Sequence, residues 1–553
     1  MPEDDTSKKK CKICSIENCY KCYGSLDLDT CDSCLPSHFP VYENNKIKKC
    51  ETMCETGDGE KCLTCNTTIN RCSSCNTGYK LIEGKYYLNY SFKAKYYTSQ
   101  ETQNIKLINF LTSQISEMIV DKESVQPSME YTFQTMGEHE VYILLDNSTI
   151  ESLSQMFYQN ENLLSISFTS KFNSQNVENM SEMFSGCSSL ISIDFSNFNS
   201  QNINNMSMLF YQCNSLISIH FSNFNTKNVK FMNHLFFNCY SLLSINLSNF
   251  DIQNLIDMES MFDSCGNLSS IDISHFNAEN VERMNNIFSG CSKLTSLSLP
   301  NSNYKKLKYI DYMFYNCREL TSINLSSLRT ENVENMEFLF FNCHSLKSIN
   351  LSNFDTKNVV NMENMFSYCS NLISVDISNF NTKQLKSMKK MFLNCSSLED
   401  INILNFNTQQ VTDMSELFAN CYSLVSLNLN NFDTQNVVNM EGMFKNCFDL
   451  TSIIISSFDT QNVTNINEMF YGCYGLISLN LNNFDIRNVT NITAMFYYCS
   501  HLNYLNISSF ESELPNIDIF NNLSSQGIIS VNYNFYEKIK AQIPINWTII
   551  LNK

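Results

Sequence analysis

The sequence predicts an α/β repeat solenoid, and three observations lead to this fold class. A cysteine recurs every 26 residues from Cys187 to Cys499, thirteen times in an unbroken series. Each unit carries leucines spaced L-x-x-L-x-L, and a second apolar series follows a short polar turn. A period between about 20 and 50 residues is typical of a chain whose units stack and bury their apolar faces against their neighbours.

The first half of each unit is predicted to be a strand, and the unit from 421 to 447 serves as the example. Leu424 precedes Leu427 and Leu429, which alternate with polar residues in the period-two pattern of a half-buried strand. The leucines are expected to face the core, whereas Ser426 and Asn428 line the exposed side. One such strand per unit predicts a parallel sheet.

The second half of each unit is predicted to be a short helix. Asp433 and Thr434 have short side chains that accept hydrogen bonds from the free backbone N–H groups of a helix start. The apolar residues that follow have the spacing of one helical stripe: Val437, Met440, Met443, Phe444 and Cys447. A strand and a short helix that close every 26 residues match the leucine-rich repeat in length and pattern. The expected architecture is a leucine-rich repeat horseshoe with a parallel concave sheet and short convex helices.

The consensus sequence of the unit is C-x2-L-x-S-I-x-L-S-N-F-x-T-x-N-V-x-N-M-x2-M-F-x2-C. It resembles the BspA-like leucine-rich repeats of bacterial lipoproteins and protist surface proteins. The resemblance covers roughly residues 152 to 510. It implies a curved binding scaffold whose usual role is adhesion to host or matrix molecules.

Two columns of repeated residues are predicted to be structural. The cysteines are expected to behave as small buried hydrophobes. An asparagine recurs at another register position, where a buried amide ladder is expected to satisfy the turn backbone of successive coils. This column consists of Asn202, Asn228, Asn254, Asn280, Asn332, Asn358, Asn436, Asn462 and Asn488. One coil departs from the pattern: Pro300 follows its strand and the usual phenylalanine is missing, so a local kink or bulge is expected there, with a binding hot spot as an alternative.

The chain is predicted to contain five segments. Residues 1–10 are charged and expected to be disordered, 11–78 form a cysteine-rich module, 79–150 a small β-rich N-terminal cap, 151–510 the repeats and 511–553 a C-terminal cap. Runs rich in aromatic and β-branched residues predict short strands in the N-terminal cap. These runs are 86–97, 105–110, 115–120, 131–134 and 140–145.

The N-terminal module contains twelve cysteines: Cys11, Cys14, Cys19, Cys22, Cys31, Cys34, Cys50, Cys54, Cys62, Cys65, Cys72 and Cys75. Their serial C-x2-C pairs resemble furin-like cysteine-rich repeats, and the even number fits six disulfides that replace a hydrophobic core. Zinc is the alternative, because four of them have the spacing of a zinc ribbon: Cys11, Cys14, Cys31 and Cys34. An oxidising compartment favours disulfides, whereas a reducing cytosol favours metal.

Two locations stay open from the sequence. The first ten residues, MPEDDTSKKK, lack the apolar core of a signal peptide, so either the chain is intracellular or its true start lies upstream of this sequence. The cysteines favour the second interpretation, and the expected location is the cell surface or the extracellular space. A transmembrane helix is not expected, because the apolar run 543–551 is interrupted and too short to span a bilayer.

Catalytic motifs are not visible in the sequence. The seven histidines lie in separate coils or domains, and neither an H-E-x-x-H motif, a G-x-S-x-G elbow nor a phosphate-binding glycine loop occurs. The sequence therefore predicts a protein that is not an enzyme and uses no cofactor. The formal net charge of -18 argues against nucleic-acid binding, which needs a basic stripe.

The predicted function is adhesion or recognition through the exposed strand face. Its amides, hydroxyls and scattered carboxylates are suited to a protein or glycan ligand on a host, a matrix or a neighbouring cell, with few of the aromatic and arginine anchors of tight interfaces. The candidate ligand-binding residues are Asp194, His220, Asp272, Asn324, Asp376, Asp400, Asn428 and Tyr504. Two alternatives stay open: these residues only keep the sheet soluble, or the chain is an intracellular interaction scaffold with a zinc-binding N-terminal module.

Overall fold

The computed structural model describes residues 90–109, 113–146, 150–219, 221, 224–514 and 517–552 with their side chains. For Thr112 and for eight strands before residue 90 it describes the backbone alone. These strands are β1 (Cys19–Cys22), β2 (Cys31–Cys34), β3 (Phe39–Glu43), β4 (Lys46–Glu51), β5 (Cys62–Asn66), β6 (Arg71–Cys75), β7 (Tyr79–Ile82) and β8 (Lys85–Leu88). They form a sheet in the order β1-β2-β4-β3 and the hairpins β5-β6 and β7-β8.

The described chain divides into two compact units, of which the first comprises residues up to Thr149 together with Leu163–Asn173 and Asp194–Phe198. Its elements after residue 90 are β9 (Phe92–Thr98), β10 (Gln103–Lys106), η2 (Thr112–Gln114), β11 (Ile115–Val120), β12 (Glu123–Val125), β13 (Glu130–Phe133), β14 (Gly137–Leu145) and β15 (Leu163–Phe168), together with the last residue of β16 (Ser192–Asp194). Six of the strands form one sheet in the order β12-β11-β14-β9-β15-β16. Alternate residues of β9 and β14 are buried, as the predicted period-two pattern requires.

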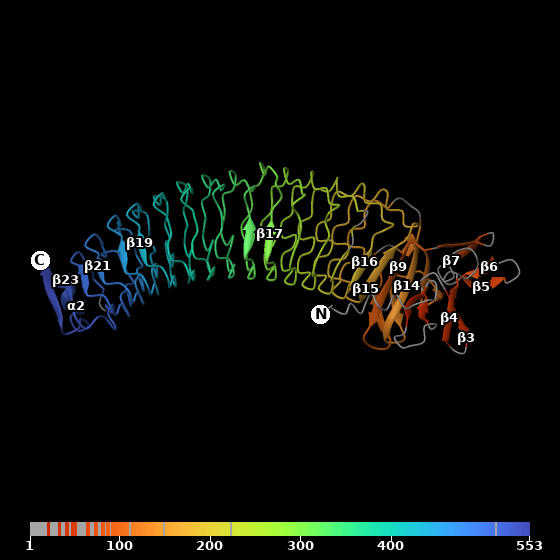
Figure 1. The fold of residues 1–553 in the computed structure, drawn as a ribbon, viewed down its shortest axis with the longest axis horizontal. Helices are drawn as coiled ribbons and strands as arrows, with labels where there is room; N and C mark the ends of the chain where they lie inside the picture. The colour runs from red at the N-terminus through yellow and green to blue at the C-terminus, as the bar shows by residue number, and fades with distance from the viewer. Residues whose placement is uncertain are drawn as a thin grey trace, which may run out of the picture. The chain divides into compact units, whose positions relative to one another are not determined.

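The second unit is the solenoid, whose coils follow one another along the ribbon in Figure 1. Its elements are β17 (Ser296–Ser298), β18 (Ser322–Asn324), β19 (Ser426–Asn428), β20 (Ser452–Ile454), β21 (Ser478–Asn480), β22 (Tyr504–Ile507), β23 (Gly527–Asn532), α2 (Tyr533–Ile539) and β24 (Trp547–Asn552). Strands of neighbouring coils pair in parallel 26 residues apart, for example Ser426 with Ser452, which confirms the predicted parallel pairing. Regular strands occur at this position in only some of the described coils.

A second parallel ladder runs through the solenoid without interruption. It joins equivalent residues of neighbouring coils from Ser152 to Asn491, with Asn439 as its member in the example coil. The leucine pattern did not predict this ladder, because most of its residues are polar and none of them is buried. The solenoid therefore carries two series of coil-to-coil backbone bonds on different sides of its core.

The predicted convex helices are wrong: the described coils contain no α-helix. In the example coil the N–H groups of Gly442, Phe444 and Asn446 donate to carbonyl groups of the next coil, at N–O distances of 2.8, 2.9 and 2.6 Å. The intervening Met443 and Lys445 donate instead to carbonyls three residues earlier, at 3.3 and 3.0 Å. This segment, 440–447 and its equivalents, is a series of turns that we name the turn ladder.

Left-handed backbone explains why the turn ladder is not helical. The residue before the cysteine has a positive φ in every coil from Gly186 to Tyr498, with a value of 58° at Asn446. Asparagine and glycine fill this position in nine of thirteen coils, and they are the residues that adopt this conformation most readily. The predicted stripe from Val437 to Cys447 is nevertheless fully buried, so the apolar spacing indicated the core side correctly but not the backbone that presents it.

A continuous stack of phenylalanine rings fills the core beside the turn ladder. Rings of neighbouring coils are 5.3 to 6.2 Å apart between centroids and nearly parallel along the whole stack. We name it the phenylalanine column; it runs from Phe157 through Phe418 and Phe444 to Phe520. Offset stacking of this kind adds to the stabilisation that burial of each ring provides.

The thirteen repeat cysteines form a second buried column. All of them are free and fully buried, and each thiol lies 3.0 to 3.2 Å from the carbonyl oxygen of a phenylalanine in the preceding coil. Burial raises the pKa of these thiols, to about 12 at Cys447. The prediction of small buried hydrophobes is confirmed, with the S–H group acting as a weak donor.

Threonine and asparagine tie each coil to its neighbour. Thr434, which was predicted to cap a helix, is fully buried; its hydroxyl donates to the carbonyl of Asp459 (2.7 Å) and accepts from the N–H of the same residue (2.8 Å). In the asparagine column, the Asn436 amide donates to the carbonyl of Gln409 at 2.8 Å, as the predicted ladder requires. Asn436 is exposed, however, so the expectation of a buried ladder is wrong.

The coil that contains Pro300 keeps the register of its neighbours. β17 pairs with β18 without a shift, and the second ladder continues from Arg283 through Tyr309 to Asn335, so the predicted bulge is absent. Tyr304 is fully buried in this coil and its hydroxyl donates to the carbonyl of Pro300 at 3.2 Å. A large side chain two positions further on therefore compensates for the missing phenylalanine.

The C-terminal segment adds two strands and the helix to the last coils. Asn532 begins α2 by accepting a hydrogen bond from the N–H of Asn534 (2.9 Å), and the ring of Phe535 packs edge-on against Phe510. β23 pairs in parallel with β22, and β24 pairs in parallel with β23. Among the described residues, no helix has both the length and the apolar character that crossing a membrane requires.

Candidate functional site

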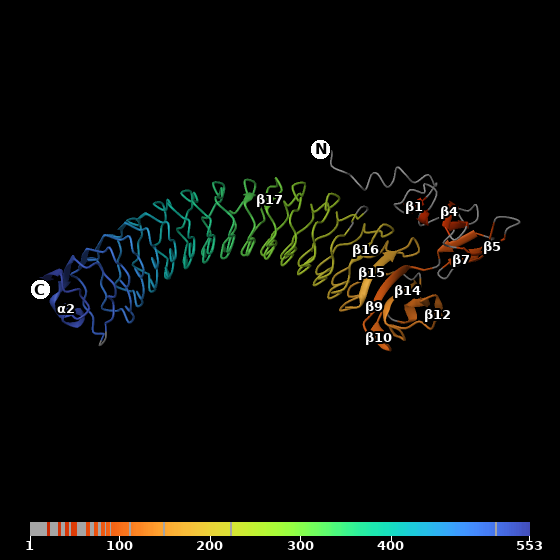
Figure 2. The ribbon, with the colours of Figure 1, turned by 60° about the horizontal axis from the view of Figure 1, so that its bottom comes forward.

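The strand face of the solenoid consists of the side chains that point outward at and just before the short strands. In the example coil Ser426 and Asn428 are exposed, whereas Leu427 and Leu429 are buried. The same alternation occurs in neighbouring described coils, so the sequence predicted correctly which residues face the solvent. Figure 2 shows the successive coils that present this face.

The candidate ligand-binding residues lie on the strand face one per coil. Asp194, Asp272, Asn324, Asp376, Asp400, Asn428 and Tyr504 are all exposed. The six from Asp272 onward form a line along the second unit and do not converge on one point. Asp194 belongs to the first compact unit and the others belong to the second. His220 lies outside the described residues. A line of single residues suits an elongated ligand better than a small one.

In most coils, the residue equivalent to Asn428 also has a structural role that the sequence did not predict. One carboxylate oxygen of Asp272 accepts hydrogen bonds from the N–H (3.0 Å) and the hydroxyl (2.7 Å) of Ser274. These bonds hold the pKa of Asp272 below its usual value. Asn428 accepts in the same way from the N–H of Asn430 at 3.1 Å. The position therefore forms the turn that ends each strand, and only its remaining polar atoms are available to a ligand.

A hollow of about 430 Å³ lies on the strand face at β17 and β18. Its lining comes from three neighbouring coils and consists of Ser270, Ile271, Asp272, Ser296, Leu297, Ser298, Ser322, Ile323 and Asn324. Ser298 stands where its neighbours have the larger Asp272 and Asn324. The site contains hydroxyls, one amide and one carboxylate, which are groups that bind by hydrogen bonding.

Exposed apolar side chains gather on the strand face of the C-terminal coils, and the sequence analysis missed them. Val425, Ile454 and Ile477 are 49%, 48% and 49% exposed. Just before the strands, the rings of Tyr422 and Phe448 stack with their centroids 4.6 Å apart, and the ring of Tyr474 lies 4.9 Å from that of Phe448, tilted by 31°. We name this surface the C-terminal patch; it consists of Tyr422, Val425, Phe448, Ile454, Tyr474, Ile477 and Tyr504. The expectation that this face has few aromatic anchors is wrong there.

The signal for the patch was present in the sequence. The position of Val425 lies between two core leucines and was passed over as part of the apolar pattern. In other coils the same position holds Thr295, Lys347 or Glu399, and a position that accepts charged residues cannot belong to the core. Isoleucine, leucine or valine at such a position indicates exposed apolar surface.

The charges around the C-terminal patch are negative. From each cysteine to the end of the following strand, the five coils between Cys395 and Ile507 have no lysine or arginine. The same segments contain the exposed carboxylates of Glu399, Asp400 and Asp449. Apolar surface with a polar and acidic rim is typical of a site that binds another protein.

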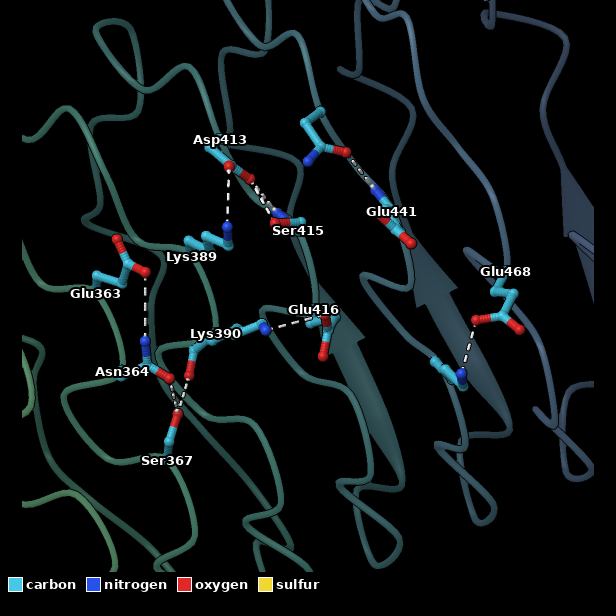
Figure 3. A network of polar contacts seen from close by, with 12 residues as sticks. Glu363, Asn364, Ser367, Lys389, Lys390, Asp413, Ser415, Glu416, Glu441 and Glu468 are labelled. Atoms are coloured by element: carbon cyan, nitrogen blue, oxygen red, sulfur yellow. Dashed lines mark hydrogen bonds and ion pairs between the residues drawn. The ribbon is translucent and has the colours of Figure 1, made fainter. Parts of the chain in front are cut away.

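The side of the turn ladder carries ion pairs between neighbouring coils, which Figure 3 shows in part. Lys390 contacts Glu416 of the next coil at 3.2 Å, and Lys389 lies 3.8 Å from Asp413. These side chains are about a third exposed, so each pair contributes roughly 0–1 kcal/mol to stability. The carboxylates are already paired within the chain, and we place no ligand there.

Asp263, on the turn-ladder side, should make stability depend on pH. Burial raises the pKa of its carboxyl group from the usual 3.8 to about 6, although the hydroxyl of Ser264 donates to it at 2.8 Å. Between these two pKa values the folded chain binds a proton that the unfolded chain releases. The contribution of this proton to the stability of the folded chain is therefore fully present below about pH 4 and is lost as the pH rises through about 6.

The Asp263→Asn variant is therefore expected to lose this fall in stability and to exceed the parent above pH 6. Urea midpoints measured from pH 4 to pH 8 on both proteins give the difference, in which the other titrating groups cancel. An identical pH profile for the two proteins would contradict the assignment.

The remaining sequence-based site assignments concern the twelve N-terminal cysteines. Their side chains, and the alternative zinc ligands among them, lie outside the described residues. Backbone pairing of β1 with β2 places Cys19 opposite Cys34 and Cys22 opposite Cys31. Disulfides and zinc both stay predictions.

Comparison with protein families decides where the solenoid belongs. The family described as "Mycoplasma protein of unknown function, DUF285" matches residues 127–244, 213–325, 240–348, 308–426 and 415–525. These overlapping matches extend over most of the chain and contain nearly all of the coils. The chain belongs to the DUF285 family. This membership agrees with the repeat consensus, which resembles BspA-like surface repeats. It assigns no activity to this DUF285 chain.

Curated proteins and solved structures provide two further comparisons for this DUF285 protein. No curated protein matches it. Among solved structures, a chain from "Crystal structure of TLR13-ssRNA13 complex" aligns at 17% sequence identity with a TM-score of 0.24. The alignment covers 69% of the DUF285 chain and 55% of that chain.

Proposed function

We propose that this DUF285 protein is a non-enzymatic recognition protein that binds a protein ligand along its strand face, at the cell surface or outside the cell. The C-terminal patch is the observation that carries the proposal. Exposed aliphatic side chains and three neighbouring aromatic rings lie on consecutive coils. The position of Val425 is also aliphatic at Ile191, Ile217, Leu243 and Ile373. An aliphatic residue at the position of Ile454, however, and three consecutive aromatic residues at the position of Tyr422 occur in no other part of the repeat sequence. Exposed apolar surface of this kind lowers solubility, and such surface is typical of a site that a partner protein covers.

The geometry of the patch favours a protein over a glycan. Sugars bind aromatic residues through the ring faces, whereas the central ring, Phe448, lies against Tyr422 of one neighbouring coil and Tyr474 of the other, which leaves less of its faces open to a sugar. Ile454 and Ile477 provide apolar area with no hydrogen-bonding group. The acidic rim adds a preference for a partner whose contact surface is apolar and basic.

The test compares the full chain with a variant in which the patch is returned to the pattern of the repeat. Val425→Thr, Ile454→Asn and Ile477→Thr introduce residues that the same positions have in neighbouring coils, as in Thr451 and Asn480. Both proteins are applied to immobilised purified matrix proteins and to a glycan array. We expect binding to at least one protein with an affinity that falls by about tenfold or more in the variant.

The matched control is the double variant Ile191→Thr, Ile217→Thr, which changes the same register position near the other end of the solenoid. It should bind as the parent does, and both variants should keep the parent's melting temperature, because exposed substitutions change stability by about 0.5 kcal/mol or less. Binding to glycans alone, or equal binding by parent and patch variant, would overturn the proposal. Antibody labelling of intact source cells tests the location.

A further inference from the structure

Five aromatic rings lie together on the turn-ladder side of the middle coils. The rings of Tyr312 and Phe338 stack with their centroids 4.7 Å apart, and those of Tyr315 and Phe341 stack at 4.9 Å. The two pairs contact each other, with Phe338 and Phe341 5.3 Å apart, and Tyr368 adds a fifth ring 5.2 Å from Phe341. Tyr368 is 43% exposed and the other four rings are partly exposed. We name this surface the aromatic block.

Two rings of the aromatic block stand on backbone that does not favour them. Tyr312 and Phe338 have φ values of 57° and 53°, in the left-handed region that bulky residues rarely adopt. The coils on either side have Asn286 and Asn364 at this register position, and asparagine adopts the conformation more readily. Stacking between coils offsets part of this disadvantage. Exposed aromatic residues are also typical of surfaces that bind another protein.

Three carboxylates accompany the aromatic block. Asp311, Glu337 and Glu363 occupy one register position of three successive coils and are partly exposed. Burial, and then the negative charges of Glu337 and Asp311, raise the pKa of Tyr312 to about 12, so these carboxylates lie beside the rings. None of the three carboxylates forms an ion pair with a residue that the structure describes.

The basic side chains at the borders of this stretch contact carboxylates outside it. Arg283 lies 3.8 Å from Glu259 of the preceding coil. Figure 3 shows Lys389 and Lys390 turned toward carboxylates of the following coil. The turn-ladder segments between these borders contain no lysine, arginine or histidine: 284–291, 310–317, 336–343 and 362–369. The negative charge beside the aromatic block is therefore not balanced by an ion pair within the stretch.

The turn-ladder side shows elsewhere in this chain how a ring and a carboxylate are covered together. Lys445 lies over the ring of Tyr471 in the next coil, with its Nζ atom 5.3 Å from the ring centroid. The same Nζ atom contacts Glu468 of that coil at 2.6 Å. One basic side chain thus places its apolar stem and its charge against an aromatic ring and a carboxylate at once. The aromatic block offers the same two groups without a basic side chain of its own.

We propose that the aromatic block binds a segment of a partner protein that carries arginine or lysine among apolar residues. The rings receive the apolar side chains and the stems of the basic ones, and Asp311, Glu337 and Glu363 bind the charged ends. Charge complementarity favours a basic partner. Five rings over three coils favour a protein segment over a small cation, because carboxylates alone suffice to hold a small cation. The block is separate from the C-terminal patch, so the proposal is independent of the ligand assigned to the strand face.

Synthetic peptides that combine arginine with apolar residues at different spacings are the probes. An array identifies the best of them, and fluorescence anisotropy measures its affinity for the full chain under reducing conditions. The double variant Glu337→Gln, Glu363→Gln should weaken binding by about tenfold or more, because each change removes one partner of an ion pair with the peptide.

The matched control is the double variant Glu416→Gln, Glu441→Gln, which makes the same change in net charge on the same side of the solenoid. Glu441 accepts a hydrogen bond from the amide of Asn465 in the next coil, as Glu337 does from Asn361. Glu416 is paired with Lys390 within the chain. This control should bind the peptide as the parent does.

The rings are tested by the double variant Tyr312→Asn, Phe338→Asn, which introduces the asparagine of neighbouring coils and should lower the affinity by about tenfold or more. Phe231→Asn removes a ring that is 39% exposed and belongs to another coil, and it should leave the affinity unchanged. The carboxylate variants remove no buried contact, so they keep the test decisive if the loss of two stacked rings destabilises the fold.

A peptide with citrulline in place of arginine separates charge from shape, and it should bind about tenfold more weakly or less than that. Four results would overturn the proposal: an array without a binding peptide, equal binding of the arginine and citrulline peptides, equal loss in the Glu337 and Glu416 double variants, or displacement of the peptide by spermine as effectively as by unlabelled peptide. Self-association of the parent that Tyr312→Asn, Phe338→Asn abolishes would also overturn it, because a second copy of the chain would then cover the block.

Discussion

Replacing Phe418 with alanine should lower the free energy of unfolding by about 3–5 kcal/mol. The ring is fully buried in the phenylalanine column, 5.5 Å from Phe392 and 6.2 Å from Phe444, with both neighbours nearly parallel to it. Truncation removes the buried apolar surface, leaves a cavity and uncovers one face of each neighbouring ring. Urea unfolding followed by circular dichroism measures the loss.

The control for this experiment is Val438→Ala in the next coil. Val438 is 43% exposed, so its truncation should change stability by about 0.5 kcal/mol or less. Because each coil contacts only its neighbours, amide exchange in Phe418→Ala should accelerate around residues 392–444 and stay unchanged in β9 and β14. A loss below about 1 kcal/mol would show that the column is not a principal source of stability.

Replacing Thr434 with valine should cost about 1–3 kcal/mol, although the two side chains have nearly the same shape. The Thr434 hydroxyl is buried and exchanges hydrogen bonds with both the N–H and the carbonyl of Asp459 in the next coil. Valine leaves the N–H without that partner in a site that water does not reach. The same urea titration measures the effect.

The Thr434→Ser variant distinguishes the contribution of the hydroxyl to stability from that of the methyl group. Serine keeps the two hydrogen bonds and loses one buried methyl, for which we expect about 1 kcal/mol. The valine variant should therefore be the less stable of the two. The reverse order would mean that packing of the methyl, and not the link to Asp459, accounts for this position.

The period and the buried face were predictable because both follow from which residues recur. Leu427, Met440 and Phe444 are apolar in a fixed register, and a residue that is apolar in nearly every coil must be protected from water in every coil. The parallel pairing of strands follows from the same regularity. These features depend on which type of residue recurs at each register position, and they depend little on backbone conformation.

The conformation of the turn ladder was not predictable from the apolar stripe. Spacings of three and four residues occur both in a helix and in successive turns that alternate inward and outward residues, so Val437, Met440 and Met443 fit either. The residue before each cysteine held the missing information. Asn446 and Gly472 favour left-handed backbone, which ends a helix, and a helix that must end within each turn of the ladder does not form.

The candidate site was predicted in part. The outward direction of Asp272 and Asn428 followed from period-two alternation, but their hydrogen bonds to the following turn depend on local backbone geometry. The C-terminal patch was missed because an apolar residue beside a leucine was counted as core. The variation at that position, from Val425 to Thr451 and Glu399, was the better guide.

The regular register of the columns makes length an adjustable property of this molecule. Every column repeats at 26 residues, so excision of residues 422–447 would join Cys421 to Phe448 and bring equivalent positions back into contact. Loss or duplication of such a block changes how far the protein reaches by one coil and leaves the surroundings of the remaining side chains as they were. A gene with this internal repetition can lengthen or shorten its product by recombination between its own repeats, without needing a compensating mutation in the core.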